Sequence, residues 1–249
     1  MFRSAKGLIA GGLMILKKKT VLFIRKTFDF FYKIKLFSPN FLSNAGIEKS
    51  LKKILTENNA NLILDLGCGN SPYNFFFLNN KYIGLDNSKN SNADIISNIE
   101  SIPVKNESVD TILLLEVLEH IDNIDKLLGE CFRVLKKKGE MIVSIPFMYN
   151  AHSQNDYIRF TIKGFRNKVS LAGFEIKKQI CIGNLVVTFI LHLQYLLFFI
   201  IPERFPLFRY IFFVPIVLLF FILNIIGYFI SFNVENQSTN YMFLIRKSN

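Results

Sequence analysis

The stretch LILDLGCGN, residues 62–70, decides the fold of this chain. Its first five residues are apolar except for Asp65, as in a strand that a parallel sheet buries on both faces. Gly67 and Gly69 follow at once, and glycines at the end of a strand let a ligand approach the backbone closely. The stretch therefore predicts a parallel α/β sheet with a ligand-binding turn at its carboxyl edge.

Further strands and helices alternate after this turn. Between residues 124 and 135, apolar residues recur at helical spacing, which predicts a helix. We expect the positive charges of Lys136–Lys138 to stabilise its carboxyl end and Gly139 to terminate it. Short apolar runs on both sides are typical of buried strands; they are KYIGLD (81–86), ADIIS (93–97), DTILLLE (110–116) and EMIVSIP (140–146). This alternation predicts a doubly wound α/β sheet with helices on both faces.

A carboxylate at the end of the second strand indicates which ligand the turn would accept. Asp86 lies 17 residues after Gly69, where the neighbouring parallel strand ends beside the glycine turn. A carboxylate at that place can accept hydrogen bonds from both hydroxyls of a ribose. Pro72 or Tyr73 stands where GxGxxG has its last glycine, and the sequence lacks GxxxxGK[ST], so ATP or GTP hydrolysis is disfavoured. The pattern favours a nucleoside-containing ligand.

Four blocks of the sequence resemble the class I S-adenosylmethionine-dependent methyltransferases, of the type 11 kind. The blocks cover residues 62–146 almost continuously; they are LDLGCGNSPY, YIGLDNS, SIPVKNESVDTILLLEVLEHI and FRVLKKKGEMIVSIP. The resemblance implies a Rossmann-like seven-stranded sheet, S-adenosylmethionine as the cofactor, and methyl transfer as the reaction.

The block at residues 148–176 resembles a bacterial subgroup linked to surface glycan synthesis. Members of that subgroup carry a His, then a Pro, then Asp-aromatic-x-Arg-aromatic-Thr. The matching residues here are His152, Asp156, Tyr157, Arg159, Phe160 and Thr161. Gln154 and Asn155 stand where the Pro is expected.

The methyltransferase resemblance implies a role for each matching residue of the cofactor site. Asp65 would help to hold the methionine amino group. Asp86 would take the ribose hydroxyls, and Asn87 would lie against the adenine. The turn and the ends of the third and fourth strands would line the rest of the cofactor, through Gly67, Cys68, Gly69, Asn98, Ile99, Leu115 and Glu116.

Methyl transfer requires alignment of the acceptor with the methyl carbon, and a hydroxyl acceptor is also helped by a base. His152 is the first candidate for that base because it follows the fifth strand at the carboxyl edge, and His120 is the second. Asp156, Tyr157 and Arg159 are candidates for binding the acceptor, while an Asp156–Arg159 pair that only pins the loop is equally compatible with the pattern. The sequence shows no metal-ligand cluster, so we expect a reaction that needs no metal.

Two long apolar runs lie near the carboxyl end. Residues 185–201 and 210–232 contain no formal charge. The flanking segments, 174–182 and 240–246, fit the sixth and seventh strands of the class I sheet. Because these two strands belong to one sheet, the two apolar runs between them must begin and end on the same side of a membrane. We therefore expect either a shallow re-entrant hairpin or two full spans.

The sequence divides accordingly into four parts. Residues 1–60 carry 12 Lys/Arg against 3 Asp/Glu. We therefore expect a basic amphipathic segment at 1–45 that suits an anionic membrane surface, although a helix packed on the domain is the alternative. Residues 46–184 would form the methyltransferase domain, 185–233 a membrane-inserted apolar helical hairpin, and 234–249 the final strand.

These observations predict a membrane-associated methyltransferase whose catalytic domain is cytoplasmic. We expect a lipid-linked, glycan or other small-molecule acceptor, the lipid bilayer as a partner, and no nucleic acid, because apolar residues interleave with the basic ones. Two alternatives stay open. One is a methyltransferase for a quinone- or lipid-type small molecule, and the other is a catalytically inactive, membrane-tethered interaction protein.

Overall fold

The computed structural model describes residues 40–55, 60–150, 154–200, 206–230 and 238–248. These residues form two compact units. The larger unit comprises the described residues of 43–188 and 233–249, and the smaller unit comprises those of 1–42 and 189–232.

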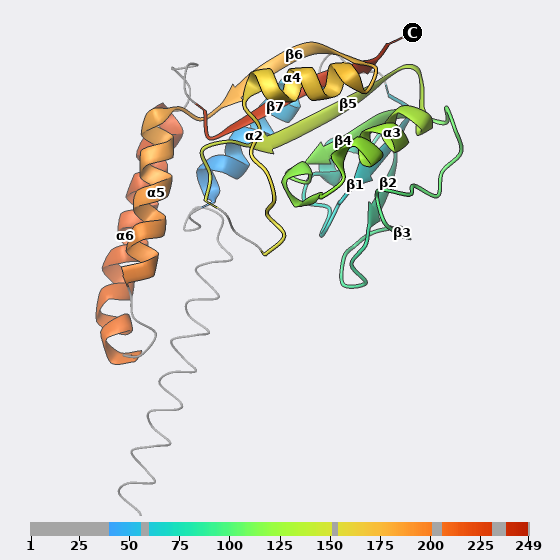
Figure 1. The fold of residues 1–249 in the computed structure, drawn as a ribbon. Helices are drawn as coiled ribbons and strands as arrows, with labels where there is room; N and C mark the ends of the chain where they lie inside the picture. The colour runs from blue at the N-terminus through green and yellow to red at the C-terminus, as the bar shows by residue number, and fades with distance from the viewer. Residues whose placement is uncertain (1–39, 56–59, 151–153, 201–205, 231–237, 249) are drawn as a thin grey trace, which may run out of the picture. The chain divides into compact units, whose positions relative to one another are not determined.

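The larger unit is built on one seven-stranded sheet (Figure 1). Its strands are β1 (Leu62–Leu66), β2 (Lys81–Asp86), β3 (Ile95–Ile96), β4 (Val109–Leu115), β5 (Leu135–Pro146), β6 (Phe174–Ile182) and β7 (Asn240–Lys247). They lie in the order β3-β2-β1-β4-β5-β7-β6. The first five are parallel, and β7 runs antiparallel to both of its neighbours. This sheet confirms the predicted doubly wound α/β fold with seven strands.

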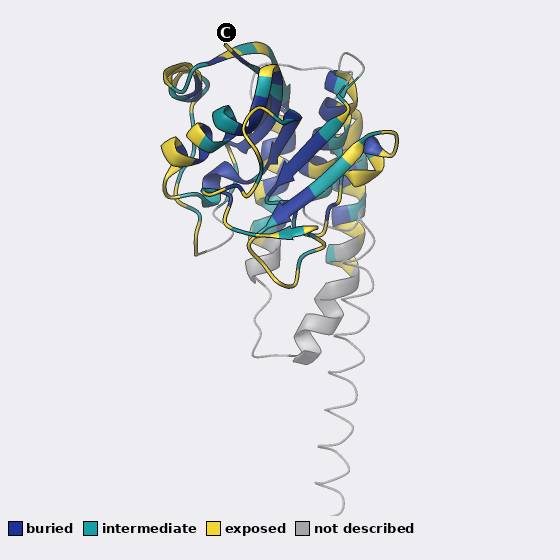
Figure 2. Ribbon diagram, turned by 90° about the vertical axis from the view of Figure 1, so that its right-hand side faces the viewer, coloured by how far each residue is buried: buried dark blue, intermediate teal, exposed yellow. Residues whose placement is uncertain are grey.

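Helices cover both faces of this sheet, and its strands are largely buried between them (Figure 2). On one face lie α3 (Ile124–Val134) and α4 (Ile162–Leu171), which share a core with Phe243 of β7. On the other face lie α2 (Phe41–Leu55) and the short 3-10 helix η2 (Asn74–Phe77), which share a core with Met242. Adjacent residues of a strand point to opposite faces, so α4 and η2 are separated by the sheet. A second 3-10 helix, η3 (Leu118–His120), follows β4.

The boundary between α3 and β5 differs from the prediction. The helix ends at Val134 and the strand begins at Leu135, so Lys136–Lys138 belong to the strand, and the expected helix end at Gly139 is wrong. The side chain of Lys136 does not cap the helix, because its Nζ lies 2.7 Å from a carboxylate oxygen of Asp110 on β4. The ion pair and the extended backbone at Leu135 explain the early start of β5.

Two apolar helices stand between β6 and β7 in the chain, α5 (Leu185–Ile200) and α6 (Pro206–Ile230). Ile182 pairs with Asn240 across the sheet, so the chain leaves and re-enters the sheet at neighbouring positions. The side chain of Asn184 starts α5 by accepting the Val187 N–H at 2.9 Å.

Within the smaller unit, α5 and α6 pack antiparallel against each other. The amide Nε2 of Gln194 donates to Oδ1 of Asn224 at 2.9 Å, and both residues are fully buried. One turn along each helix, a Cβ at Gly227 would lie 3.3 Å from Ile190 Cδ1, so the glycine permits the close approach. Of the helices in the described part of the chain, none is both long and apolar enough to cross a membrane.

The described residues test only some of the membrane predictions. The two predicted spans are not found among the described residues. The shallow re-entrant alternative stays a prediction, as do the proposed bounds of the four parts. Residues 1–39 of the predicted basic segment lie outside the described residues.

Candidate functional site

The glycine turn after β1 has the backbone conformation that its sequence predicts. Gly67 and Gly69 have φ values of 70° and 51°, in the left-handed region that favours glycine. The Gly67 N–H donates to the Leu85 carbonyl at 2.7 Å, which fastens the turn to β2. A Cβ at Gly67 would lie 2.8 Å from Val117 Cγ2, whereas a Cβ at Gly69 would meet nothing within 4 Å. The turn is packed on one side and open at Gly69.

Asp86 closes this turn from the end of β2. One oxygen of its carboxylate accepts the Gly69 N–H at 2.9 Å, and the other accepts the Ser88 N–H at 2.8 Å. These two bonds fix the direction of the carboxylate, while its remaining lone pairs can accept further donors. Asp86 is therefore oriented before any ligand binds.

A cavity of about 530 Å³ lies beside the turn and Asp86, at the carboxyl edge of the sheet. Its volume is within the range of small-molecule and cofactor sites. The predicted cofactor residues that line it are Gly67, Asp86, Asn87, Asn98, Ile99 and Glu116. Residues for which the sequence predicts no role in the site also line it, namely Glu100, Val117, Ile121, Asp122 and Asn155. An open glycine turn, an oriented carboxylate and a cavity of this size fit a nucleoside cofactor such as S-adenosylmethionine.

Four predicted cofactor residues are not part of the cavity lining: Asp65, Cys68, Gly69 and Leu115. Asp65 is 3% exposed, and its carboxylate accepts the hydroxyl hydrogen of Tyr82. Burial, together with the charge of Asp86, raises the pKa of Asp65 to about 7 against the opposing effect of that hydrogen bond. The predicted contact of Asp65 with the methionine amino group stays a prediction.

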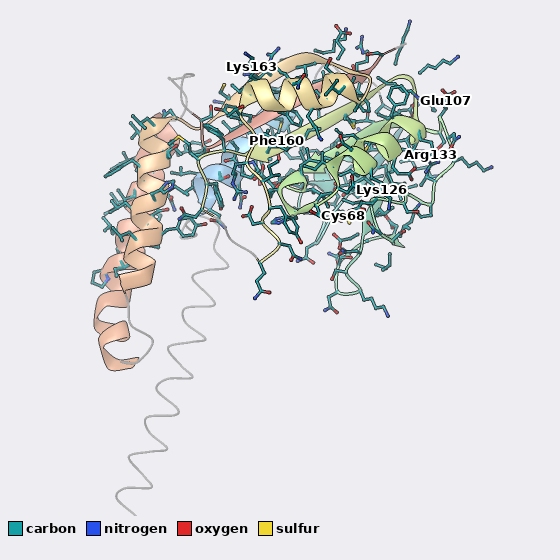
Figure 3. The ribbon with its side chains drawn as sticks, viewed as in Figure 1. Cys68, Glu107, Lys126, Arg133, Phe160 and Lys163 are labelled. Atoms are coloured by element: carbon teal, nitrogen blue, oxygen red, sulfur yellow. The ribbon has the colours of Figure 1, made fainter. Side chains whose placement is uncertain are left out.

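Cys68 is a buried packing residue in the structure (Figure 3). Its Sγ fills the space beside Gly84, where a Cβ would lie only 2.8 Å away. Burial raises the pKa of the Cys68 thiol to about 11, so the thiol is neutral at physiological pH. Cys68 therefore shapes the turn and does not supply a nucleophile.

Glu116 occupies a strained position directly after β4. Its φ of 57° is left-handed, which is uncommon for a residue other than glycine. One carboxylate oxygen accepts from Ser144 Oγ at 2.7 Å and the other from Asn240 Nδ2 at 2.7 Å. Burial raises the pKa of Glu116, and the charge of nearby Glu119 raises it further, while both hydrogen bonds oppose the rise. Strain of this kind persists where surrounding contacts over-determine it, often at functional sites.

The contact between Glu116 and Asn240 gives a first testable prediction. Asn240→Ala should lower the free energy of unfolding by about 1–2 kcal/mol at alkaline pH, because an ionised buried carboxylate then loses a donor. The loss should shrink at acidic pH, where Glu116 is protonated. The sign follows from linkage, since the variant raises the folded-state pKa further and stability falls as pH rises towards that pKa. Denaturant unfolding at several pH values measures the effect, with the exposed Asn167→Ala on α4 as the control.

His120 lines the cavity, and the buried Glu119 lies beside it. His120 Nδ1 is 2.9 Å from the Asn155 carbonyl oxygen. Because a carbonyl only accepts, Nδ1 carries the hydrogen and Nε2 keeps a lone pair. Nε2 is 3.7 Å from Oε1 of Glu119, whose side chain is buried with neither oxygen hydrogen-bonded. Burial raises the pKa of the Glu119 carboxyl to about 7.

The loop after β5 contains the residues predicted to bind the acceptor, and it reaches the same cavity. The backbone N–H of Tyr157 donates to the Glu119 carbonyl at 2.8 Å, and Tyr157 lines the cavity. Asp156 and Arg159 form a bidentate ion pair, so these two side chains hold the loop in shape. His152 lies outside the described residues. His120 is thus the candidate base whose position is described, and Tyr157 is the predicted acceptor residue that reaches the cavity.

Metal ligation was not expected from the sequence. In the described ranges, the structure brings together no group of three or more His, Cys, Asp or Glu residues that could hold a metal ion. The expectation that the reaction needs no metal stays a prediction.

Sequence comparison relates part of the chain to known proteins. A family model described as a methyltransferase domain matches residues 64–143. An uncharacterized protein of Methanocaldococcus jannaschii is 31% identical over 122 residues, 46% of this chain and 53% of that protein. The chain therefore spans about half the length of this curated relative.

Solved structures share the fold at low sequence identity. A SAM-dependent methyltransferase from Archaeoglobus fulgidus has a TM-score of 0.54 and 12% identity, with 81% of this chain and 93% of that chain covered. The [4+2]-cyclase SpnF has a TM-score of 0.52 and 15% identity, with 81% and 80% covered. Residues 64–143 thus match a methyltransferase domain, in a chain with the class I methyltransferase fold, and this domain and fold imply S-adenosylmethionine as the cofactor.

Proposed function

We propose that this protein transfers the methyl group of S-adenosylmethionine to a lipid-linked acceptor at the cytoplasmic face of a membrane. The observation that carries the enzymatic part is the pairing of an open glycine turn with the oriented Asp86 carboxylate at one cavity. The turn leaves room for the cofactor, and Asp86 has lone pairs for the ribose hydroxyls.

The residues of the chain bind and align the reactants, while the cofactor supplies the activated methyl group. Bound beside Gly67, Asp86 and Asn87, S-adenosylmethionine would supply a methyl group to an acceptor oxygen aligned with its carbon–sulfur bond. The hydroxyl proton of the acceptor passes to Nε2 of His120, which the Asn155 carbonyl holds in the required tautomer. Tyr157, beside His120 in the cavity wall, contacts the acceptor.

The lipid-linked acceptor is supported by the apolar surface of α5 and α6. Large side chains on these helices are more than half exposed: Leu185, Phe189, Leu196, Leu218, Ile222 and Phe229. Extended exposed apolar surface marks a site for a membrane or a partner. A shallow hairpin would use this surface at the bilayer interface, and a polyprenyl-linked glycan is the acceptor class that the loop motif favours.

Two measurements on the full chain in detergent test this proposal. Calorimetric titration should give S-adenosylmethionine binding on the order of micromolar. Labelled S-adenosylmethionine with a total bacterial lipid extract should then move label into the organic phase. Label in a quinone-like neutral lipid would support the small-molecule alternative. A folded chain that binds no cofactor would overturn the enzymatic proposal and favour a tethered interaction protein.

A further inference from the structure

The segment that follows the glycine turn exposes apolar side chains on the larger unit. In place of a long helix, the chain forms only η2, four residues in length. Phe77 of η2 is buried in the core, but Phe75 is 46% exposed and Leu78 is 83% exposed. These two side chains contribute little to the core, so their exposure calls for another explanation.

A lysine side chain of α2 lies over this apolar segment. The rings of Phe75 and Phe76 lie 4.2 Å apart between centroids, and Lys52 Nζ is 5.8 Å from the Phe76 ring. That distance is within the range of a cation–π contact. The exposed end of α2 and the η2 segment therefore form one continuous surface.

The same surface continues along α2 and onto β6. Lys49 and Lys53 are four residues apart on α2 and thus neighbours on one helix face. Burial lowers the pKa of Lys49, and the charge of Lys53 lowers it further, which reflects their closeness. Lys178 Nζ of β6 lies 3.5 Å from the Lys53 carbonyl oxygen. We call this surface the basic–aromatic patch, consisting of Lys49, Lys52, Lys53, Phe75, Leu78 and Lys178.

We propose that the basic–aromatic patch docks the larger unit onto anionic lipid headgroups, with Phe75 and Leu78 entering the interface. Lysines next to apolar side chains match a surface that is negatively charged outside and apolar beneath. The inference rests on the membrane location proposed above but not on the methyl transfer. Because η2 follows the glycine turn within a few residues, docking keeps the cofactor turn near the lipid surface.

The chain contains no Trp, which allows a local test. In the full chain, Leu78→Trp introduces a single indole at the more exposed of the two apolar positions of the patch. With vesicles of phosphatidylglycerol and phosphatidylcholine, its emission should shift to shorter wavelength and be quenched by brominated acyl chains. Vesicles of phosphatidylcholine alone should leave it unchanged.

Matched controls separate local docking from attachment of the chain elsewhere. Leu171→Trp is the control for the indole, because Leu171 is 79% exposed on α4, across the sheet from η2. Its emission should not change. Adding Lys52→Glu and Lys53→Glu to Leu78→Trp should raise the lipid concentration at half-maximal shift at least about 20-fold. Adding Lys137→Glu and Lys163→Glu, which change the net charge equally, should have a much smaller effect; Lys163 lies on α4 (Figure 3).

Three results would overturn the inference. The first is an unchanged Leu78→Trp emission in a chain that floats with the vesicles, which would leave the proposed membrane location intact. The second is equal quenching of the Leu78→Trp and Leu171→Trp chains. The third is an equal response to the two lysine pairs. None of these results bears on cofactor binding, so failure of this inference is distinguishable from failure of the proposed reaction.

Discussion

Asp86→Ala should weaken S-adenosylmethionine binding about 100-fold. The carboxylate is the group that can accept hydrogen bonds from both ribose hydroxyls, and hydrogen bonds to a charged group contribute about 1.5–3 kcal/mol each. Loss of both bonds, each at the low end of this range, weakens binding about 100-fold. Calorimetric titration of the detergent-solubilised chain measures the change, and thermal unfolding establishes that the variant is folded.

The control for this prediction must account for the backbone bonds that Asp86 also makes. Asp86 accepts the N–H groups of Gly69 and Ser88, so its removal loosens the turn as well as the ribose contact. Asp94 offers a comparison, since its carboxylate accepts the Gly84 N–H at 2.8 Å and does not line the cavity. Asp94→Ala should change the affinity less than about threefold. Equal losses in the two variants would contradict a direct ribose contact.

The sequence was sufficient to predict those parts of the site that depend on local chain geometry. A buried strand followed by two glycines predicts the turn, and a strand of known length after it places Asp86 beside Gly69. Parallel neighbours end at the same edge, so the 17-residue separation becomes a 2.9 Å hydrogen bond. The loop motif likewise placed Tyr157 at the cavity.

The parts that were missed depend on contacts between distant residues. Asn240 lies 124 residues after Glu116, and only the pairing of β5 with β7 brings its amide to that carboxylate. The Tyr82 hydroxyl bond to Asp65 across neighbouring strands had no local signal either. The lysines after α3 match a helix-ending pattern, but they lie in β5, where Lys136 pairs with Asp110 of another strand. Local patterns hold no information on such partners.

Gly67→Ala should lower the free energy of unfolding by about 3 kcal/mol, the largest stability change that we expect from a single methyl group. A left-handed φ costs a residue with a Cβ about 1–2 kcal/mol. The new Cβ would also lie 2.8 Å from Val117 Cγ2, and overpacking of this kind costs about 1–3 kcal/mol. Denaturant unfolding of the detergent-solubilised chain measures the sum.

Two other glycines separate these contributions. Gly129→Ala, in the interior of α3 with nothing within 4 Å of its Cβ, should stabilise the chain by up to about 1 kcal/mol. Gly69→Ala has the left-handed φ without the close contact, so it should lose only about 1–2 kcal/mol. A loss in Gly67→Ala no larger than that in Gly69→Ala would contradict the clash with Val117.

The contact with Val117 also links the stability of the turn to cofactor binding. Val117 lines the cavity and lies against Gly67, so a side chain at position 67 would displace a residue of the cavity wall. Gly67→Ala should therefore weaken S-adenosylmethionine binding as well as folding, and Val117→Ala should restore part of both. A double-mutant cycle with a coupling of about 1–2 kcal/mol would establish the contact. Additive effects would show that the turn tolerates the methyl group through backbone movement, and the packed side of the turn would then have no role in shaping the cavity.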